Sequence, residues 1–128
     1  MTYTQIFVLI LIVHLLADFA LQTHDQATKK STEMKWLLYH ISTYTFVWSI
    51  VFFILPIREG VNNFFGWWIF TLLIFLTHFL TDFITSRIGT PFWKNNDPHN
   101  GFVVVGADQV VHYITLWAIL LKFTKIVV

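Results

Sequence analysis

The 128-residue chain has no cysteine and few charged side chains. Without cysteine, disulfide bonds, thiolate metal ligands and cysteine nucleophiles are all excluded. Lys, Arg, Asp and Glu make up only 12% of the residues, and the net charge of +1 comes without a basic cluster of the kind that binds nucleic acid. We therefore expect neither thiol chemistry nor a nucleic-acid partner.

Apolar side chains dominate instead, at 56% of the sequence. They gather into four runs, each long enough to cross a hydrocarbon core that takes roughly 20 helical residues. The runs cover about residues 3–22, 36–57, 65–86 and 102–123. Little chain remains between them, so the sequence predicts a single integral membrane domain over residues 1–128, an all-α bundle of four transmembrane helices. The first run lacks a basic leader, and we expect it to be a membrane helix rather than a cleaved signal.

Histidine and aspartate interrupt three of these runs at a spacing of four residues. The pairs are His14 with Asp18, His78 with Asp82 and, in reverse order, Asp108 with His112. This spacing places both side chains of a pair on one face of a helix, about 6 Å apart in rise. A carboxylate at the middle of a spanning helix costs about 2.5–3.5 kcal/mol when it faces lipid. The pairs are therefore expected to face inward, toward one another.

His40, near the start of the second run, adds a fourth histidine in the same half of the membrane. Imidazole and carboxylate groups suit a divalent cation, zinc first, with manganese or iron as alternatives. The expected metal ligands are His14, Asp18, His40, His78, Asp82, Asp108 and His112. Asp108 is alternatively a general base, and Gln22 and Gln109 are expected to orient water or substrate beside it. Such a site just below the headgroups predicts metal-dependent hydrolysis of a lipid-like or phosphoester substrate.

Other interpretations of the same polar residues stay open. They could form a cation or proton pathway in a small transporter or channel component, although the opposite half of the membrane has few polar residues beyond Thr45, Ser49 and Thr71. They could also be a structural hydrogen-bond network in a membrane subunit. A haem is disfavoured, because its pocket is apolar and an acid lies one turn from each paired histidine. His24 and His99 lie in loops and are expected to be solvated.

The first and third runs share the pattern His-x-Leu-x-Asp-Phe, at residues 14–19 and 78–83. This similarity suggests two helical hairpins in the same orientation, a parallel repeat. Lys and Arg number five in loops 23–35 and 87–101 against three on the other side, which places these loops in the cytoplasm and the chain in the cytoplasmic (inner) membrane. The lipid bilayer is the expected partner. A homodimer is a further expectation, although no decisive Gly-x-x-x-Gly motif marks its interface.

Together these motifs resemble a known family. The stretch His14-Leu15-Leu16-Ala17-Asp18-Phe19 with Leu21-Gln22-Thr23, followed by Lys30, His40, His78-x-x-x-Asp82 and Asp108-Gln109-x-x-His112, is similar to a bacterial group of small membrane proteins catalogued as domain of unknown function 3307. The resemblance spans nearly the whole chain and implies a prokaryotic polytopic membrane protein whose family motifs are these polar residues. It implies no activity. A looser similarity to membrane-bound metal-dependent hydrolases with His-x-x-x-Asp helices favours the enzyme interpretation by analogy.

Overall fold

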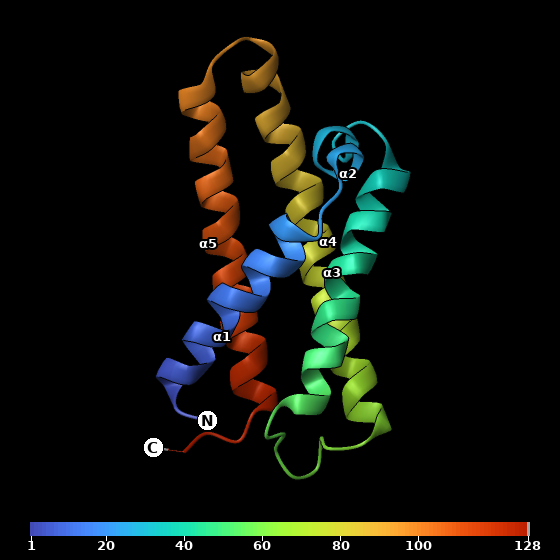
Figure 1. Ribbon diagram of the computed structural model, residues 1–128, viewed down its shortest axis with the longest axis vertical. Coiled ribbons are helices and arrows are strands. Elements are labelled where there is room, and N and C mark those ends of the chain that lie inside the picture. The colour runs from blue at the N-terminus through green and yellow to red at the C-terminus, as the bar shows by residue number, and fades with distance from the viewer. Residues whose placement is uncertain (128) are drawn as a thin grey trace.

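The computed structural model describes residues 1–127, and within that range every regular element is a helix (Figure 1). In chain order the elements are α1 (Tyr3–Leu15), the π-helical turn η1 (Leu16–Ala20), the short α2 (His24–Lys29), α3 (Met34–Ile54), α4 (Phe64–Lys94) and α5 (Pro98–Phe123). Four segments are long and apolar enough to cross a membrane: α1 continued by η1, α3, α4 and α5. The predicted all-α bundle of four membrane-length helices is confirmed.

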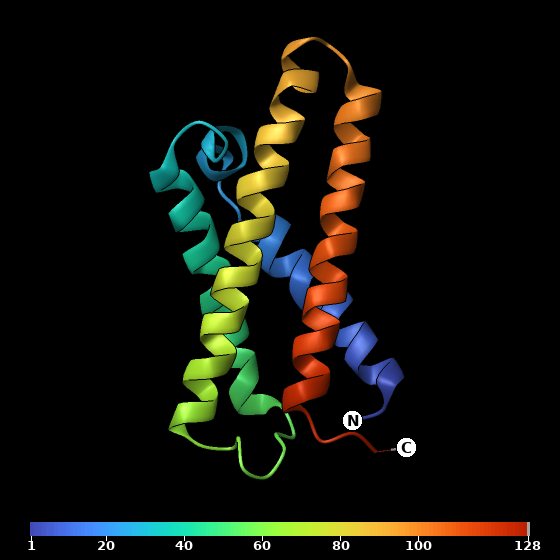
Figure 2. The ribbon, with the colours of Figure 1, turned by 180° about the vertical axis from the view of Figure 1, so that it is seen from behind.

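The helices α3, α4 and α5 run roughly side by side, and α1 crosses the bundle obliquely (Figures 1 and 2). α4 packs against both α3 and α5, while α1 packs against α5 and η1 against α3. Both termini and the α3–α4 connection lie at one end, and α2 and the α4–α5 turn lie at the other. The two hairpins run in the same direction but differ in packing, because α4 packs extensively on α5 whereas α3 packs on η1 more than on α1.

The α4–α5 hairpin is longer than the sequence predicts. α4 continues past the expected end at residue 86 to Lys94, and α5 begins at Pro98 instead of residue 102, so the expected loop 87–101 is mostly helical. The two helices approach closely here, and Gly101 allows it because a Cβ at that position would lie only 2.7 Å from the ring of Trp93. This packing outweighs Gly89 and Pro91, which locally favour a break. The whole turn is residues 95–97, with Asn96 at a positive φ of 54°.

Two local features lie between α1 and α3. η1 is a π turn in which the amide of Leu21 donates to the carbonyl of Leu16 at 2.9 Å, so the first helix ends at Ala20 and not at residue 22 as expected. The polar segment 23–35, expected to be a loop, contains α2. The hydroxyl of Thr23 accepts from the amide of Gln26, and the Gln26 side chain accepts from the amide of Thr23, which forms a capping box. The capping box stabilises the start of α2, which packs against α3.

The apolar core fills the half of the bundle that holds both termini. Phe70 is fully buried there, with its ring centroid 5.2 Å from that of Phe52 and 5.4 Å from that of Phe123. Lipid is as apolar as these side chains, so close packing rather than transfer from water holds this half together. A hydrogen bond of 2.9 Å between the hydroxyls of Ser49 and Thr71 also links α3 to α4. The polar residues of interest lie above this core.

Candidate metal centre

Side chains from all four membrane-length helices meet in one polar cluster beneath α2. The cluster consists of His14 and Asp18 from the first helix, His40 from α3, His78 and Asp82 from α4, and Asp108, Gln109 and His112 from α5. The four histidines, Asp18 and Asp82 are buried, while Asp108 and Gln109 are partly exposed. The structure thus brings together every residue predicted as a metal ligand. His24 and His99 are exposed, as expected, but they lie in the first turns of α2 and α5 and not in loops.

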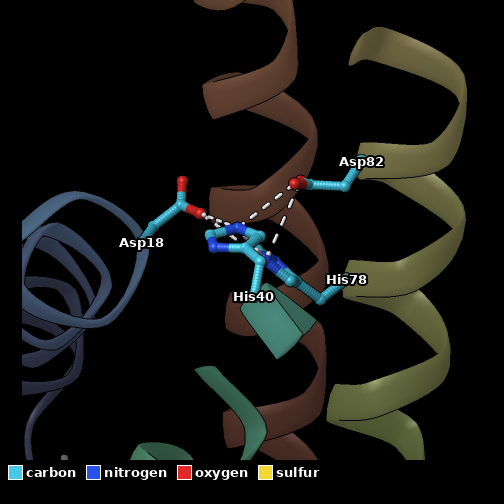
Figure 3. A group of neighbouring side chains, drawn as sticks. All are labelled: Asp18, His40, His78 and Asp82. Atoms are coloured by element: carbon cyan, nitrogen blue, oxygen red, sulfur yellow. Dashed lines mark hydrogen bonds and ion pairs between the residues drawn. The ribbon is translucent and has the colours of Figure 1, made fainter. Parts of the chain in front are cut away.

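The ligating atoms of four residues converge within the cluster (Figure 3). These residues are Asp18, His40, His78 and Asp82, and the four atoms all lie within 4.8 Å of one another. His40 Nε2 is 3.0 Å from Asp18 Oδ1 and 3.2 Å from Asp82 Oδ2. The same nitrogen is 3.2 Å from His78 Nε2, which in turn is 3.5 Å from Asp18 Oδ1. A ring nitrogen carries a single hydrogen or a single lone pair, so hydrogen bonding satisfies only one of these contacts of His40.

Four of the six spacings among these atoms are close to the edges of a small coordination polyhedron, while His78 Nε2 comes no nearer than 3.8 Å to Asp82 Oδ1. A tetrahedral zinc site with bonds of about 2.0–2.1 Å has its ligand atoms about 3.3–3.4 Å apart. The four contacts just given range from 3.0 to 3.5 Å. Asp18 Oδ1 is buried without a hydrogen-bond partner among residues 1–127, although Nε2 of His40 lies 3.0 Å and Nε2 of His78 lies 3.5 Å from it. An orphaned carboxylate oxygen facing two imidazoles is suited to a cation.

When all four imidazoles are neutral, the carboxylates of the cluster outnumber its cations. Asp18, Asp82 and Asp108 bring three carboxylates, and Lys30 brings one ammonium, whose Nζ lies 2.6 Å from Asp82 Oδ2. With neutral imidazoles two negative charges remain, which a divalent cation would neutralise. Burial opposes the charged form of Lys30, but the carboxylates of Asp82 and Asp18 outweigh it and raise the pKa of Lys30 above its ordinary value. The sequence indicated Lys30 only through the family resemblance.

A second group of candidate ligands adjoins the first and shares Asp18 with it. It consists of Asp18, Asp108 and His112. His112 Nε2 lies 3.0 Å from Asp82 Oδ1 and 3.5 Å from Asp108 Oδ1. The hydroxyl of Thr85 donates to Asp108 Oδ1 at 2.5 Å, and the amide of Gln109 donates to Asp108 Oδ2 at 3.0 Å. Asp108 is thus held in place from two sides between the first group and the surface.

His14 frames the cluster from α1. Its Nε2 lies 2.8 Å from Gln109 Oε1 and its Nδ1 lies 2.9 Å from the hydroxyl of Tyr44, so both ring nitrogens have protein partners. The amide of Gln109 donates to Asp18 Oδ2 at 3.3 Å, and His14 Nε2 lies 3.4 Å from the same oxygen. His14 and Gln109 together therefore orient the Asp18 carboxylate. The ring of Tyr44 stacks on His78 with centroids 3.6 Å apart and planes 5° apart. Tyr44 was not predicted, although its place four residues after His40 puts both on one face of α3.

Gln22, the other predicted catalytic glutamine, follows η1. Its amide oxygen is buried without a hydrogen-bond partner in the described part of the chain, and no hydrogen bond there ties it to the cluster. The catalytic roles of Gln22, Gln109 and Asp108 stay predictions. Asp82 also lies further from the end of its helix than the expected boundary at residue 86 implies, because α4 runs on to Lys94, about 18 Å along the axis from Asp82.

A cleft of about 200 Å³ opens beside the cluster, between α2, α4 and α5. Its lining includes Lys30, Thr85, Ser86, Thr90, Trp93 and Asp108. Lys30 and Asp108 belong to both the cleft and the polar cluster. The cleft is therefore the route by which a molecule from the α2 end would reach the candidate ligands.

Comparison with known proteins gives a family but no characterised relative. Residues 6–128 match the model of a family described as protein of unknown function (DUF3307). No curated protein and no solved structure matches the chain.

Proposed function

We propose that this chain, which belongs to the DUF3307 family, is an integral membrane metalloprotein that holds a divalent cation among Asp18, His40, His78 and Asp82. The proposal is carried by the convergence of two imidazole nitrogens and two carboxylate oxygens, from α3, α4 and the η1 turn, within 4.8 Å of one another. Two nitrogen and two oxygen donors at near-tetrahedral spacing favour zinc over manganese, which prefers more oxygen ligands. Iron would draw on the second group for further ligands.

The reaction that this arrangement serves best is hydrolysis of a lipid-like or phosphoester substrate. A divalent cation at this position would act as a Lewis acid and make nearby water a better nucleophile. Asp108 lies between the ligands and the cleft, and its carboxylate takes up the proton of an attacking water that enters through the cleft. Thr85 and Gln109 hold that carboxylate in position. Gln109 therefore acts as a positioning residue.

The apolar half of the bundle supports a reaction over passage of an ion. Below the cluster, Trp48, Phe70 and Phe123 are almost completely buried. The Ser49 and Thr71 hydroxyls in that half bond to each other. A cation that entered from the cleft would thus meet a packed aromatic layer within residues 1–127, where desolvation is costly. We also propose that the α2 end lies in the cytoplasm of a cell with the chain in its inner membrane, because that end carries the excess of Lys and Arg.

The test is elemental analysis of the untagged protein purified in a mild detergent, followed by an assay on short-chain phosphoesters. We expect about one equivalent of zinc, manganese or iron per chain. Hydrolysis should stop when a chelator removes the metal and return when the metal is restored. Protein that binds none of these metals, even after incubation with each, would overturn the proposal. Protein that keeps the metal without hydrolysis would overturn the reaction and leave the metal centre.

A further inference from the structure

We propose that the cleft beside the metal centre binds the phosphate group of a membrane lipid while the acyl chains of that lipid stay in the bilayer. This inference rests on the proposed function, because it names the substrate class of the same site. The shared chemistry is a phosphate ester anion. The structure supports a lipid as its source through the size of the cleft and the side chains at its mouth.

The wall of the cleft offers donors that an anion needs. The ammonium of Lys30 has three hydrogens, and in the described residues its single hydrogen-bond partner is Asp82 Oδ2, at 2.6 Å. The hydroxyl of Ser86 is buried in the cleft wall and has no hydrogen-bond partner in residues 1–127. Buried hydroxyls are nearly always satisfied in folded proteins, so a ligand oxygen is the natural partner for Ser86. Among the described residues, the cleft lining thus contains one cation, Lys30, and one buried, unpartnered hydroxyl, that of Ser86.

The size of the cleft limits what it encloses. Pockets that enclose whole ligands usually measure about 300–1,000 Å³. A cleft of about 200 Å³ holds a headgroup but leaves the remainder of a lipid outside. The indole of Trp93 lines the cleft and packs edge-on against Phe102, and the two residues are 44% and 66% exposed. A tryptophan beside an exposed phenylalanine suits the boundary between headgroups and acyl chains. These features favour a lipid over free phosphate.

A matched pair of glycines allows the cleft to be blocked selectively. Gly89 lies on α4 in the cleft wall, where an added Cβ would meet Val104 at 3.5 Å and Trp93 at 3.7 Å, both ordinary contacts. The Cβ of a leucine at position 89 would fit without a clash, and the remaining carbons of its side chain would fill the cleft. Gly106 lies on α5 with nothing within 4 Å of an added Cβ. Leucine at either position changes helix propensity alike, so Gly106→Leu controls for the substitution itself.

The experiment measures binding to metal-loaded protein in detergent by calorimetry, with three probes: dihexanoyl phosphatidic acid, dihexanoylglycerol and inorganic phosphate. Wild type should bind phosphatidic acid at least about tenfold more tightly than either other probe, which is the value of one charge-assisted hydrogen bond or more. Ser86→Ala should weaken that binding about tenfold for the same reason. Gly89→Leu should abolish it, and Gly106→Leu should leave it intact.

The metal content of every variant is measured in parallel and should equal that of wild type, because Ser86, Gly89 and Gly106 lie outside both ligand groups. Unchanged phosphatidic acid binding in both Gly89→Leu and Ser86→Ala would overturn the inference while the metal centre stands. Equal affinity for inorganic phosphate would overturn the lipid as the source of the anion. Wild-type protein that takes up no metal would overturn the proposed function itself, and with it this inference.

Discussion

Replacing Asp82 by asparagine removes one charge and one ligand oxygen from the metal centre with almost no change of shape. Asp82 touches three partners: Lys30 Nζ at 2.6 Å, His112 Nε2 at 3.0 Å and His40 Nε2 at 3.2 Å. The asparagine side chain keeps one acceptor oxygen, but its NH2 group replaces the other oxygen and turns two hydrogens toward one of these positively polarised partners. Losing an outer partner of a metal site typically weakens metal binding about 10–100-fold, so the loss of a direct ligand should reach at least about 100-fold.

That loss converts into a stability difference. At a free metal concentration about 100 times the wild-type dissociation constant, the metal stabilises the folded protein by about 2.7 kcal/mol. With a dissociation constant about 100-fold weaker, the same concentration stabilises Asp82→Asn by only about 0.4 kcal/mol. The difference of about 2.3 kcal/mol is well within reach of an unfolding experiment.

The assay is thermal unfolding in detergent with zinc buffered by a chelator, beside elemental analysis of the purified proteins. Asp25→Asn is the matched control, because Asp25 pairs with Lys29 at 2.7 Å on the exposed surface of α2, away from the cluster. The control should keep the wild-type metal content and response. Asp82→Asn protein with the same metal content and the same stabilisation by zinc would refute the assignment of the cluster as a metal centre.

Lys30→Met should destabilise metal-free protein by about 3 kcal/mol, the low end for breaking a buried ion pair, because Lys30 is 19% exposed. Zinc should then stabilise this variant more than wild type in thermal unfolding, and equal responses would contradict the charge balance. Tyr44→Phe removes the hydroxyl that contacts His14 but keeps the ring stacked on His78. Chemical denaturation should show that the free energy of unfolding falls by about 1 kcal/mol, and an unchanged free energy would contradict that hydrogen bond. Hydrogen bonds from Asn100 to Asp97 lower the pKa of Asp97 in the folded protein below its ordinary value of 3.8. The stability that Asp97 contributes as the cap of α5 is therefore fully present above pH 3.8, and it is lost as the pH falls through the lowered pKa. Amide-exchange protection at the start of α5 should therefore fall in acid for wild type but not for Asp97→Asn, and parallel behaviour would rule out this cap.

The number and type of the spanning helices were predictable from the sequence, because a bilayer imposes length and hydropathy on anything that crosses it. The inward direction of His14, Asp18, His78 and Asp82 was equally predictable, since the cost of charge in lipid leaves no other stable orientation. These are properties of single helices in a known solvent. They need no knowledge of which helix packs against which.

The end of α4 was not predictable from the same rules. Gly89 and Pro91 are local signals for a break, and they were overridden by the close packing of Trp93 on Gly101 across the hairpin. One signal for the correct boundary was present. Asp97 followed by a proline is the pattern of a helix cap and first helical position, and α5 begins there.

Within the candidate site, the sequence indicated which residues lie together but not which side chains contact one another. Local spacing cannot tell that both nitrogens of His14 are taken by Tyr44 and Gln109 while Asp18 keeps a free oxygen. Nor can it show that Lys30, on a connection outside the spanning runs, reaches Asp82. These pairings depend on the relative rotation and depth of separate helices, which no single stretch of sequence encodes.

η1 settles the rotation of one of those helices. A π turn carries one more residue than an α turn, so the residues before and after it are offset by about 100° from a continuous α-helix. The offset lets Ile6 and Ile10 face the apolar core while Asp18, further along the same rod, faces His40. Deleting Leu16 or Ala17 would leave the composition of the first helix almost unchanged and rotate Asp18 about the helix axis by about 100° relative to α1. Whether the first helix supplies a ligand at all is thus a matter of winding, set by the residue count of a single turn.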